Sequence, residues 1–459
     1  MNAAQQTIAG GLKVSKSIAA VDLSAGALAH APALLKAHFG AGTAFLIADE
    51  NTWAAAGLAL DAHLRAAGIP VKAHVLPAKP KPKPSVELAQ TLIGALQESD
   101  AIPVAVGSGV INDVVKYAAY KLGRPYLCVA TAASMDGYTS AGAPLSEKGF
   151  KKTIQCAPPR AIVADVDVLR KAPPEMTSWG YSDLAGKIPA GADWILADEL
   201  GIEAIAPAAW ALVQGHLRDF LAQPRNVARG ESGAIENLFA GLSLVGFAME
   251  IYGSSRPASG ADHQIAHLWE MQGLEHDGGL VSHGSCVAIG SLAVLQLYSW
   301  FLAQDIDRLD IEATVARAPD FSGKAEEIRR AFGPSEICDR SIEETRLKHV
   351  DKDVLRQRLI RLKEVWPRLK ARLEQQLVTP QRFTQMLRAA GAPAAPMDIG
   401  VDDRYLRQTV LSSLFLRSRY TILDVLDDAG WLQAAVNAFP ASPGITTGAT
   451  AHAGLPQDR

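Results

Sequence analysis

The sequence predicts an α/β domain followed by an all-α domain. Short apolar runs alternate with helical patterns up to about residue 175, and long helical patterns dominate after residue 176. In addition, one early apolar run ends in a glycine-rich turn. Such alternation is typical of a parallel sheet with crossover helices. We therefore expect domains at 1–175 and 176–440, and a flexible tail at 441–459 because its residues are small and polar.

The strands of the first domain are expected at five apolar runs, which are AFLIAD (44–49), VKAHVLP (71–77), IPVAV (102–106), YLCVA (126–130) and AIVAD (161–165). Helical patterns between them cover 52–68, 85–100 and 111–123. Ser85 is a good N-cap for the second of these helices. The run KPKPKP (79–84) predicts an exposed, extended linker, because prolines exclude helix and lysines favour water.

Helices of the second domain are expected at 241–253, 287–303, 340–375 and 404–438. The most apolar is VAIGSLAVLQLYSWFLA (287–303), about as long as the shortest membrane spans. Because Gln296, Tyr298 and Ser299 dilute it, we expect a buried core helix and no membrane span.

The bulk properties exclude several classes of protein. A net charge of -3 argues against nucleic-acid binding, which usually needs a basic surface. The four cysteines lie far apart without a CxxC pair, which excludes a zinc knuckle and a disulfide framework. The first residues, MNAAQQTIAGG, lack the pattern of a secretory signal. We expect a cytoplasmic protein.

The run IPVAV ends in Gly107-Ser108-Gly109, and an amphipathic helix pattern follows. In a strand–turn–helix arrangement of this kind, backbone N–H groups and the helix N-terminus face an anion, and glycine leaves room for a phosphate. The turn predicts a nucleotide-binding domain, although structural turns use the same residues. Asp113 and Lys116 could equally form a solvated ion pair.

The next strand ends in VATAASMDGYTS (129–140), where small residues surround one carboxylate. Ligands of open α/β sheets bind beyond the carboxyl ends of the strands. Thr131 and Ser134 are therefore expected to donate hydrogen bonds to a cofactor, and Asp136 to hold a substrate hydroxyl. The alternative is a plain Ser/Asp turn.

A set of one carboxylate and three imidazoles occurs in the helical half. Asp183, in GYSDLAGK, is expected near a helix start, where an N-cap role is the alternative. His263 and His267 are four residues apart on one predicted helix face, and His283 follows sixteen residues later. Such ligands suit zinc, nickel or ferrous iron. The alternative is that these are ordinary surface or core histidines.

These motifs together point to one family. In the segments GSGVINDVVKY, YLCVATAASMDGYTSAGAPL, GYSDLAGK, SGADH and HG, the chain resembles the bacterial and archaeal sn-glycerol-1-phosphate dehydrogenases. They belong to a superfamily with iron-containing alcohol dehydrogenases, glycerol dehydrogenases and dehydroquinate synthase. The resemblance implies a dehydroquinate synthase-like fold, and it is densest between about 100 and 200.

The resemblance also implies residue roles. The residues matching the NAD(P) site are Asp49 near the adenosine ribose, Gly107, Ser108, Gly109, Asp113 and Lys116 at the phosphates, and Thr131 and Ser134 along the cofactor. Asp136 matches a substrate-contacting carboxylate, and His267 a histidine beside the substrate. The ligands of one divalent metal match Asp183, His263 and His283. The chain departs from the family after Gly284, where Ser285 stands in place of the usual glutamate.

The implied reaction is reversible reduction of dihydroxyacetone phosphate by NAD(P)H to sn-glycerol 1-phosphate, in an interdomain cleft. Candidates for binding the substrate phosphate are Lys187, Lys151 and Lys152. The alternatives are a glycerol or other small-alcohol dehydrogenase, a dehydroquinate synthase-like cyclase, and a non-catalytic nucleotide-binding homologue. Relatives are commonly homo-oligomers, which we expect here as well.

Overall fold

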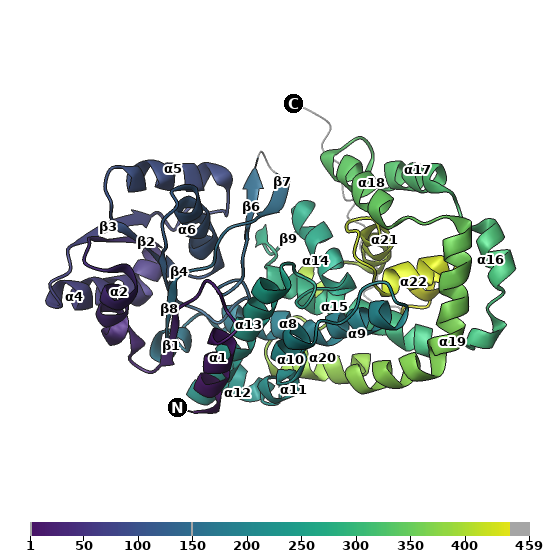
Figure 1. The fold of residues 1–459 in the computed structure, drawn as a ribbon, viewed down its shortest axis with the longest axis horizontal. Helices are drawn as coiled ribbons and strands as arrows, with labels where there is room; N and C mark the ends of the chain where they lie inside the picture. Colours follow the sequence, from purple (N-terminus) through teal and green to yellow (C-terminus); the bar gives the residue numbers. More distant parts are fainter. Residues whose placement is uncertain (1, 148–149, 441–459) are drawn as a thin grey trace.

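The computed structural model describes residues 2–147 and 150–440 (Figure 1), so the expected tail at 441–459 lies outside the described residues. Strands gather in the N-terminal part and helices fill the rest, as Figure 1 shows. The predicted order of an α/β part followed by a helical part is therefore confirmed.

The α/β part contains a six-stranded parallel sheet. Its order across the sheet is β1 (Ala20–Ser24), β8 (Ala161–Asp165), β5 (Leu127–Ala130), β4 (Ile102–Gly107), β2 (Ala44–Asp49) and β3 (Val71–Leu76). The five expected strands are all present. The strand β1 was not predicted, because only Leu23 of its five residues is fully buried and its sequence, AVDLS, is not an apolar run.

Helices cover both faces of this sheet. The helices α2 (Ala31–Phe39) and α4 (Leu58–Ala66) bury one face, and α5 (Val86–Gln97) and α6 (Gly109–Lys121) bury the other. Between β2 and α4 lie α3 (Glu50–Thr52) and a π-helical turn (Trp53–Gly57). Ser85 caps α5 as expected, since its hydroxyl accepts from Leu88 N. The linker 79–84 lies outside helices and strands with its lysines exposed, as predicted.

A hairpin of β6 (Ala143–Glu147) and β7 (Phe150–Ile154) follows the sheet's fifth strand in sequence and was not predicted. A second short ladder, β9 (Glu275–His276) with β10 (Gly279–Leu280), corrects the expectation that strands end near residue 176. Both ladders have only two strands, so the sequence carries few of the buried apolar residues that mark central strands.

The helical part begins with α7 (Val166–Leu169) and α8 (Pro174–Ala185) and continues to residue 437. Its further α-helices are α9 (Lys187–Glu199), α10 (Pro207–Gln214), α11 (Leu217–Phe220), α12 (Pro224–Ala228), α13 (Ser232–Tyr252), α14 (Ala261–Met271), α15 (His283–Leu302), α16 (Ile311–Arg317), α17 (Phe321–Phe332), α18 (Glu336–Lys348), α19 (Lys352–Gln376), α20 (Pro380–Ala389), α21 (Asp403–Ser413), α22 (Ile422–Asp428) and α23 (Leu432–Asn437).

Two of these helices, α13 and α15, are long and apolar enough to cross a membrane by length and composition. Of the most apolar windows, 72% of residues in α13 and 78% in α15 are buried inside the protein. Burial by the other helices accounts for this hydropathy, as expected for the core helix at 287–303.

The first helix, α1 (Ala3–Leu12), packs against α13 of the helical part (Figure 1). Asn2 Nδ2 donates to Glu236 at 2.5 Å and Ser15 Oγ to Glu250 at 2.6 Å. Gly11 lies against the ring of Phe247, where a Cβ would not fit. The predicted domain of residues 1–175 thus includes a helix that packs on the other half.

Candidate functional site

Three neighbouring strands end where the sequence predicts the cofactor. Asp49 is the last residue of β2, Gly107 is the last of β4, and Thr131 follows β5 directly. Thr131 N donates to Gly107 O at 3.2 Å, which joins the two strand ends. The parallel register therefore brings Asp49, the glycine turn and Thr131 to one edge of the sheet.

The turn after β4 leads directly into α6. Ser108 is the N-cap of this helix, yet its hydroxyl makes no capping hydrogen bond to the first amides. A Cβ added to Gly109 would have its nearest neighbour, Met135, at 3.6 Å. An uncapped helix N-terminus next to small residues is a good environment for a phosphate.

Asp49 has a structural task as well. Its carboxylate caps α3 by accepting from Thr52 N at 2.9 Å, and Thr52 Oγ1 accepts from Asp49 N. The capping geometry fixes the carboxylate beyond the end of β2.

Lys116 contacts the chain rather than the glycine turn. Its fully buried ammonium donates to the carbonyl oxygens of Gly137, Ser140 and Gly142 at 2.8–3.1 Å. These three bonds use all of its protons. The expected phosphate contact of Lys116 is therefore corrected: the residue holds the segment that follows Asp136. Asp113 lies 3.8 Å from this ammonium and is also buried.

The segment 131–140 joins the sheet to the helical part. Ser134 is buried, and the Tyr138 hydroxyl donates to Ala132 O at 2.9 Å. The Thr139 hydroxyl donates to Ser243 O of α13 at 2.7 Å. The segment is thus fastened at both ends, with Asp136 between them.

Asp183 lies in the last turn of α8, which corrects the expected position near a helix start. The helix begins at Pro174, because proline at the first helical position needs no hydrogen-bond partner for its nitrogen. An N-cap role for Asp183 is thereby excluded. Its carboxylate is fully buried and faces α14 and α15.

The predicted metal ligands converge. One ligand atom from each of Asp183, His263 and His283 lies within 4.8 Å of the other two. His263 Nε2 is 3.5 Å from Asp183 Oδ1, and the rings of His263 and His283 have centroids 5.3 Å apart. The close approach of α15 to α8 needs Gly284, where any Cβ would lie 2.3 Å from Trp179 O.

Each of these imidazoles has a carboxylate behind it, and the sequence analysis found neither carboxylate. Asp262 Oδ2 lies 2.7 Å from His263 Nδ1, and Glu270 Oε1 lies 2.6 Å from His283 Nδ1. Such partners fix the ring orientation and leave Nε2 for a metal. The only signal was Asp262 next to His263, since Glu270 approaches His283 only through the β9–β10 turn.

Lys187 connects the metal ligand to the predicted substrate carboxylate. Its fully buried ammonium lies 2.6 Å from Asp183 Oδ1 and 2.8 Å from Asp136 Oδ2. Burial opposes charge on both groups, but their mutual attraction holds the pKa of Asp183 below and that of Lys187 above the ordinary value. Asp136 N also donates to Asp183 Oδ2 at 3.0 Å. Lys187 is thereby committed to two carboxylates.

His267 completes the group of imidazoles. Its ring centroid lies 5.8 Å from that of His263 and 5.7 Å from that of His283. Burial lowers the pKa of His267 well below its ordinary value, and Glu270 opposes this only in part. A neutral imidazole therefore stands beside the predicted metal ligands.

A divalent metal fits these residues. The set offers one carboxylate oxygen and two imidazole nitrogens, which leaves coordination positions for other ligands, as in catalytic sites. Both ring orientations are fixed by Asp262 and Glu270, and the carboxylate of Asp183 is ionised. The donor set suits zinc, nickel or iron equally.

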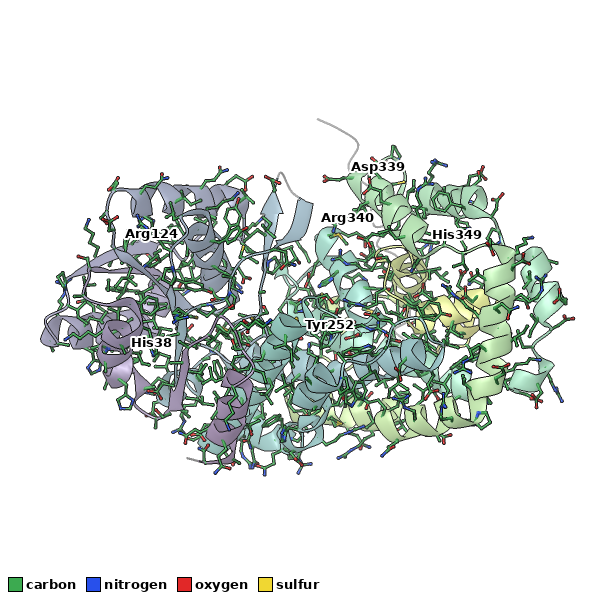
Figure 2. All side chains as sticks on the ribbon, in the orientation of Figure 1. His38, Arg124, Tyr252, Asp339, Arg340 and His349 are labelled. Atoms are coloured by element: carbon green, nitrogen blue, oxygen red, sulfur yellow. The ribbon has the colours of Figure 1, made fainter. Side chains whose placement is uncertain are left out.

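One well-formed cavity lies elsewhere, in the helical part. It measures about 720 Å³ and is formed by α16, α17, α18, α19, α22 and the end of α21. Ion pairs such as Lys348 with Asp424, at 2.6 Å, line it together with His349 (Figure 2). The residues that line this cavity include none of the predicted site residues, so the site rests on the side-chain geometry above.

Known sequences resemble this chain over much of its length. The family profile described as iron-containing alcohol dehydrogenase matches residues 22–173. A glycerol-1-phosphate dehydrogenase (NAD(P)+) from Bacillus licheniformis is 35% identical over 261 residues, which cover 56% of this chain and 65% of the relative. The corresponding enzyme from Geobacillus thermodenitrificans is 30% identical over 352 residues, covering 74% of this chain and 75% of the relative. The chain thus spans about two thirds of the length of the first of these relatives.

Solved structures share the fold over most of the chain. A probable glycerol dehydrogenase from Sinorhizobium meliloti superposes with a TM-score of 0.57 at 17% identity, covering 92% of this chain and 98% of that one. An NADH-dependent butanol dehydrogenase from Thermotoga maritima also gives 0.57, at 15% identity, covering 92% and 97%. At these identities the likeness concerns the fold alone.

Proposed function

The chain belongs to the glycerol-1-phosphate dehydrogenase family of the iron-containing alcohol dehydrogenase superfamily, and from this membership we propose its activity. It is a metal-dependent, NAD(P)-linked oxidoreductase that interconverts dihydroxyacetone phosphate and sn-glycerol 1-phosphate. The observation that carries the proposal is the convergence of Asp183, His263 and His283 beside the segment 131–136. The active site lies where that segment meets α8.

Asp183, His263 and His283 hold the metal in this proposal. A divalent ion held there would supply Lewis-acid chemistry, polarising the substrate carbonyl and lowering the cost of the negative charge on its oxygen. Asp262 and Glu270 keep both rings oriented for this task. Lys187 and Asp136 N keep the carboxylate of Asp183 ionised and fixed.

Two side chains act on the substrate. His267 is neutral and lies beside both metal-binding imidazoles, so it can take a proton from the substrate hydroxyl during oxidation. The imidazolium formed in this way would return the proton during reduction. Asp136 accepts a hydrogen bond from a substrate hydroxyl, and Lys187 holds it in place at 2.8 Å. The pairing orients the carboxylate before the substrate arrives.

The cofactor occupies the carboxyl edge of the sheet. The turn Gly107–Gly109 and the N-terminus of α6 receive its pyrophosphate, and Thr131 and Ser134 line the path toward the metal ligands. Asp49 stands beyond β2 near the adenosine ribose, which favours NAD over NADP through repulsion of a 2′-phosphate. Asp113 and Lys116 support this edge from inside α6.

The test is oxidation of NAD(P)H coupled to dihydroxyacetone phosphate, with chiral analysis of the product. We expect sn-glycerol 1-phosphate, loss of turnover after chelation, and recovery on adding back zinc, nickel or ferrous iron. Equal turnover with unphosphorylated dihydroxyacetone would favour a small-alcohol dehydrogenase instead. A purified chain with no stoichiometric metal and no gain from added metal would sink the proposal.

A further inference from the structure

The helix α21 and the segment that follows it run along α14, the helix that carries His263 and His267. As this chain segment proceeds from Tyr405 to Arg419, its hydrogen-bond partners run backwards along α14, from the end of the helix to the residues before its start. The hydrogen bonds are Tyr405 Oη to Gln272 Oε1 at 2.8 Å, Trp269 Nε1 to Thr409 Oγ1 at 3.0 Å, and Arg419 Nη1 to Ser259 O at 2.7 Å. The residues between Thr409 and Arg419 therefore pass the turns of α14 that bear the two histidines.

Arg417 lies within this stretch. It is partly buried, and it makes no hydrogen bond or ion pair with any residue in 2–147 or 150–440. Its neighbour Ser418 is fixed, since Ser418 N donates to Glu344 Oε2 at 2.8 Å. A guanidinium presents five donors, and a partly buried one without an acceptor is uncommon. The backbone next to Arg417 is thus fixed, while its guanidinium keeps its donors available.

The positive charge of Arg417 lowers the pKa of His267. Burial lowers the pKa of His267, Glu270 raises it, and the positive charges of His283 and Arg417 lower it further. Burial and Arg340 lower the pKa of Arg417 itself, and Glu344 acts in the opposite direction. The contacts along α14 place Arg417 on the stretch of chain that passes His267, and the effect of its charge on His267 agrees with this position.

Three other cations near this site are committed, whereas the side chains of Lys151 and Lys152 lie outside the described residues. Lys187 is held between Asp183 and Asp136. Arg419 donates to Ser259 O and to Ser255 Oγ, and Arg256 donates to Tyr420 O and Asp193 O while facing Glu203. Arg417 is the arginine of this group whose donors are not used.

We propose that Arg417 binds the phosphate of the substrate and so makes the site select a phosphorylated ketone over its unphosphorylated analogue. The proposal rests on the function proposed above. A guanidinium matches phosphate oxygens with two parallel N–H donors, which gives both charge and orientation. With the carbonyl near the metal ligands, the phosphate end of a three-carbon substrate lies toward α21, and Lys187 is no longer needed as its partner.

The experiment compares Arg417→Met and Arg417→Lys with Arg346→Met. Arg346 is an exposed arginine of α18 that stacks on Phe321 with its guanidinium carbon 4.1 Å from the ring centroid. We expect Arg417→Met to raise KM for dihydroxyacetone phosphate by about thirtyfold or more, because a charged phosphate contact is lost. Its kcat/KM for unphosphorylated dihydroxyacetone should change less than about threefold. Arg417→Lys should recover part of the loss, and Arg346→Met should match the parent.

A binding readout separates this inference from the proposed function. Inorganic phosphate is titrated calorimetrically into the chain saturated with NAD+, which occupies the glycine turn. We expect binding to the parent chain and to Arg346→Met, and at least a tenfold weaker affinity in Arg417→Met. If the parent chain fails to reduce dihydroxyacetone phosphate, the proposed function falls, and this titration still decides whether Arg417 is an anion site. An unchanged phosphate affinity, or equal losses on both ketones, overturns the inference.

Discussion

The two sides of the candidate site are built in opposite ways. The cofactor side consists of two short stretches, residues 107–109 and 131–136. They are nearly neutral turns of small residues at the strand ends. The metal side consists of Asp183, Lys187, Asp262, His263, His267, Glu270 and His283, drawn from four helices. Its charged groups neutralise one another in pairs. The first side depends on backbone shape, and the second depends on individual side chains.

This difference indicates where the molecule tolerates change. Backbone amides remain when a side chain is replaced, provided that the replacement fits. A buried carboxylate or imidazole has no substitute, because removing one partner leaves the other charged and unpaired. We therefore expect single substitutions to act more strongly on the metal side.

The largest effect is expected for His263→Ala. Removing one of three metal ligands should abolish stoichiometric metal binding and lower kcat by about three orders of magnitude or more. Metal content by mass spectrometry and turnover with dihydroxyacetone phosphate measure this. His38→Ala, at a half-buried residue of α2 in the α/β part (Figure 2), serves as the control. Retained metal in the His263 variant would contradict the ligand assignment.

We also expect the free energy of unfolding to depend on pH through Asp193, which lies next to the metal side. This buried carboxylate accepts from Ala261 N at the start of α14, from Tyr298 Oη and from Ile422 N. Burial raises the pKa of Asp193 to about 6, and these hydrogen bonds lower it only in part. The folded protein thus keeps a proton that the unfolded chain has lost above its ordinary pKa of 3.8.

The sign follows from proton linkage. The free energy of unfolding contributed by Asp193 is highest below pH 4, falls as pH rises to about 6, and is constant above that value, with a total of about 3 kcal/mol. Urea unfolding of Asp193→Asn should lack this fall, whatever constant offset the lost carboxylate causes. An identical slope in the variant and the parent between pH 4 and pH 6 would show that Asp193 ionises normally.

The junction of the two sides depends on Gly180 of α8. A Cβ at this position would lie 1.9 Å from Ala133 O, in the cofactor segment. We expect Gly180→Ala to cost about 2 kcal/mol of unfolding free energy and to weaken metal and cofactor binding together. The control is Gly94→Ala in α5, where no atom lies within 4 Å and helix propensity predicts a gain of about 1 kcal/mol. A stable Gly180 variant with normal binding would show that the two sides are independent.

The smallest effects are expected for the carboxylates behind the imidazoles. Asp262→Asn should weaken metal affinity by about tenfold to a hundredfold, as measured by competition with a chelator. Glu270→Gln should cost less, because the His283 side chain is 30% exposed and water can replace the lost partner, whereas that of His263 is 6% exposed. A larger loss of metal affinity in Glu270→Gln than in Asp262→Asn would mean that burial of the histidine does not determine how much its carboxylate partner contributes.

The sequence predicted the central strands well, because strands buried on both faces are continuous apolar runs. It missed β1, whose Asp22 and Ser24 interrupt such a run, and the two-stranded hairpins, which bury little. It placed Asp183 at a helix start, because the motif GYSDLAGK was weighed without Pro173 and Pro174. The helix α8 begins at Pro174, nine residues before Asp183.

For the site, local spacing and family resemblance identified residues that do converge. The partners of those residues could not be predicted from the sequence. Lys187 faces Asp136 across 51 positions of sequence, and Glu270 approaches His283 through a turn. The resemblance implied a phosphate contact for Lys116, but only the fold of 137–142 shows three carbonyl oxygens converging on it. Such contacts depend on tertiary packing, which residue spacing does not encode.

The packing of α1 on α13 has a mechanical consequence. The chain passes between the sheet and the helices twice, once after α1 and once between β8 and α7. A body tethered to another at two points can swing about the line that joins them but cannot slide or twist freely. Motion of the sheet relative to the helices is therefore limited to rotation about one axis. Cutting the chain between residues 13 and 19 would allow the sliding and twisting motions as well.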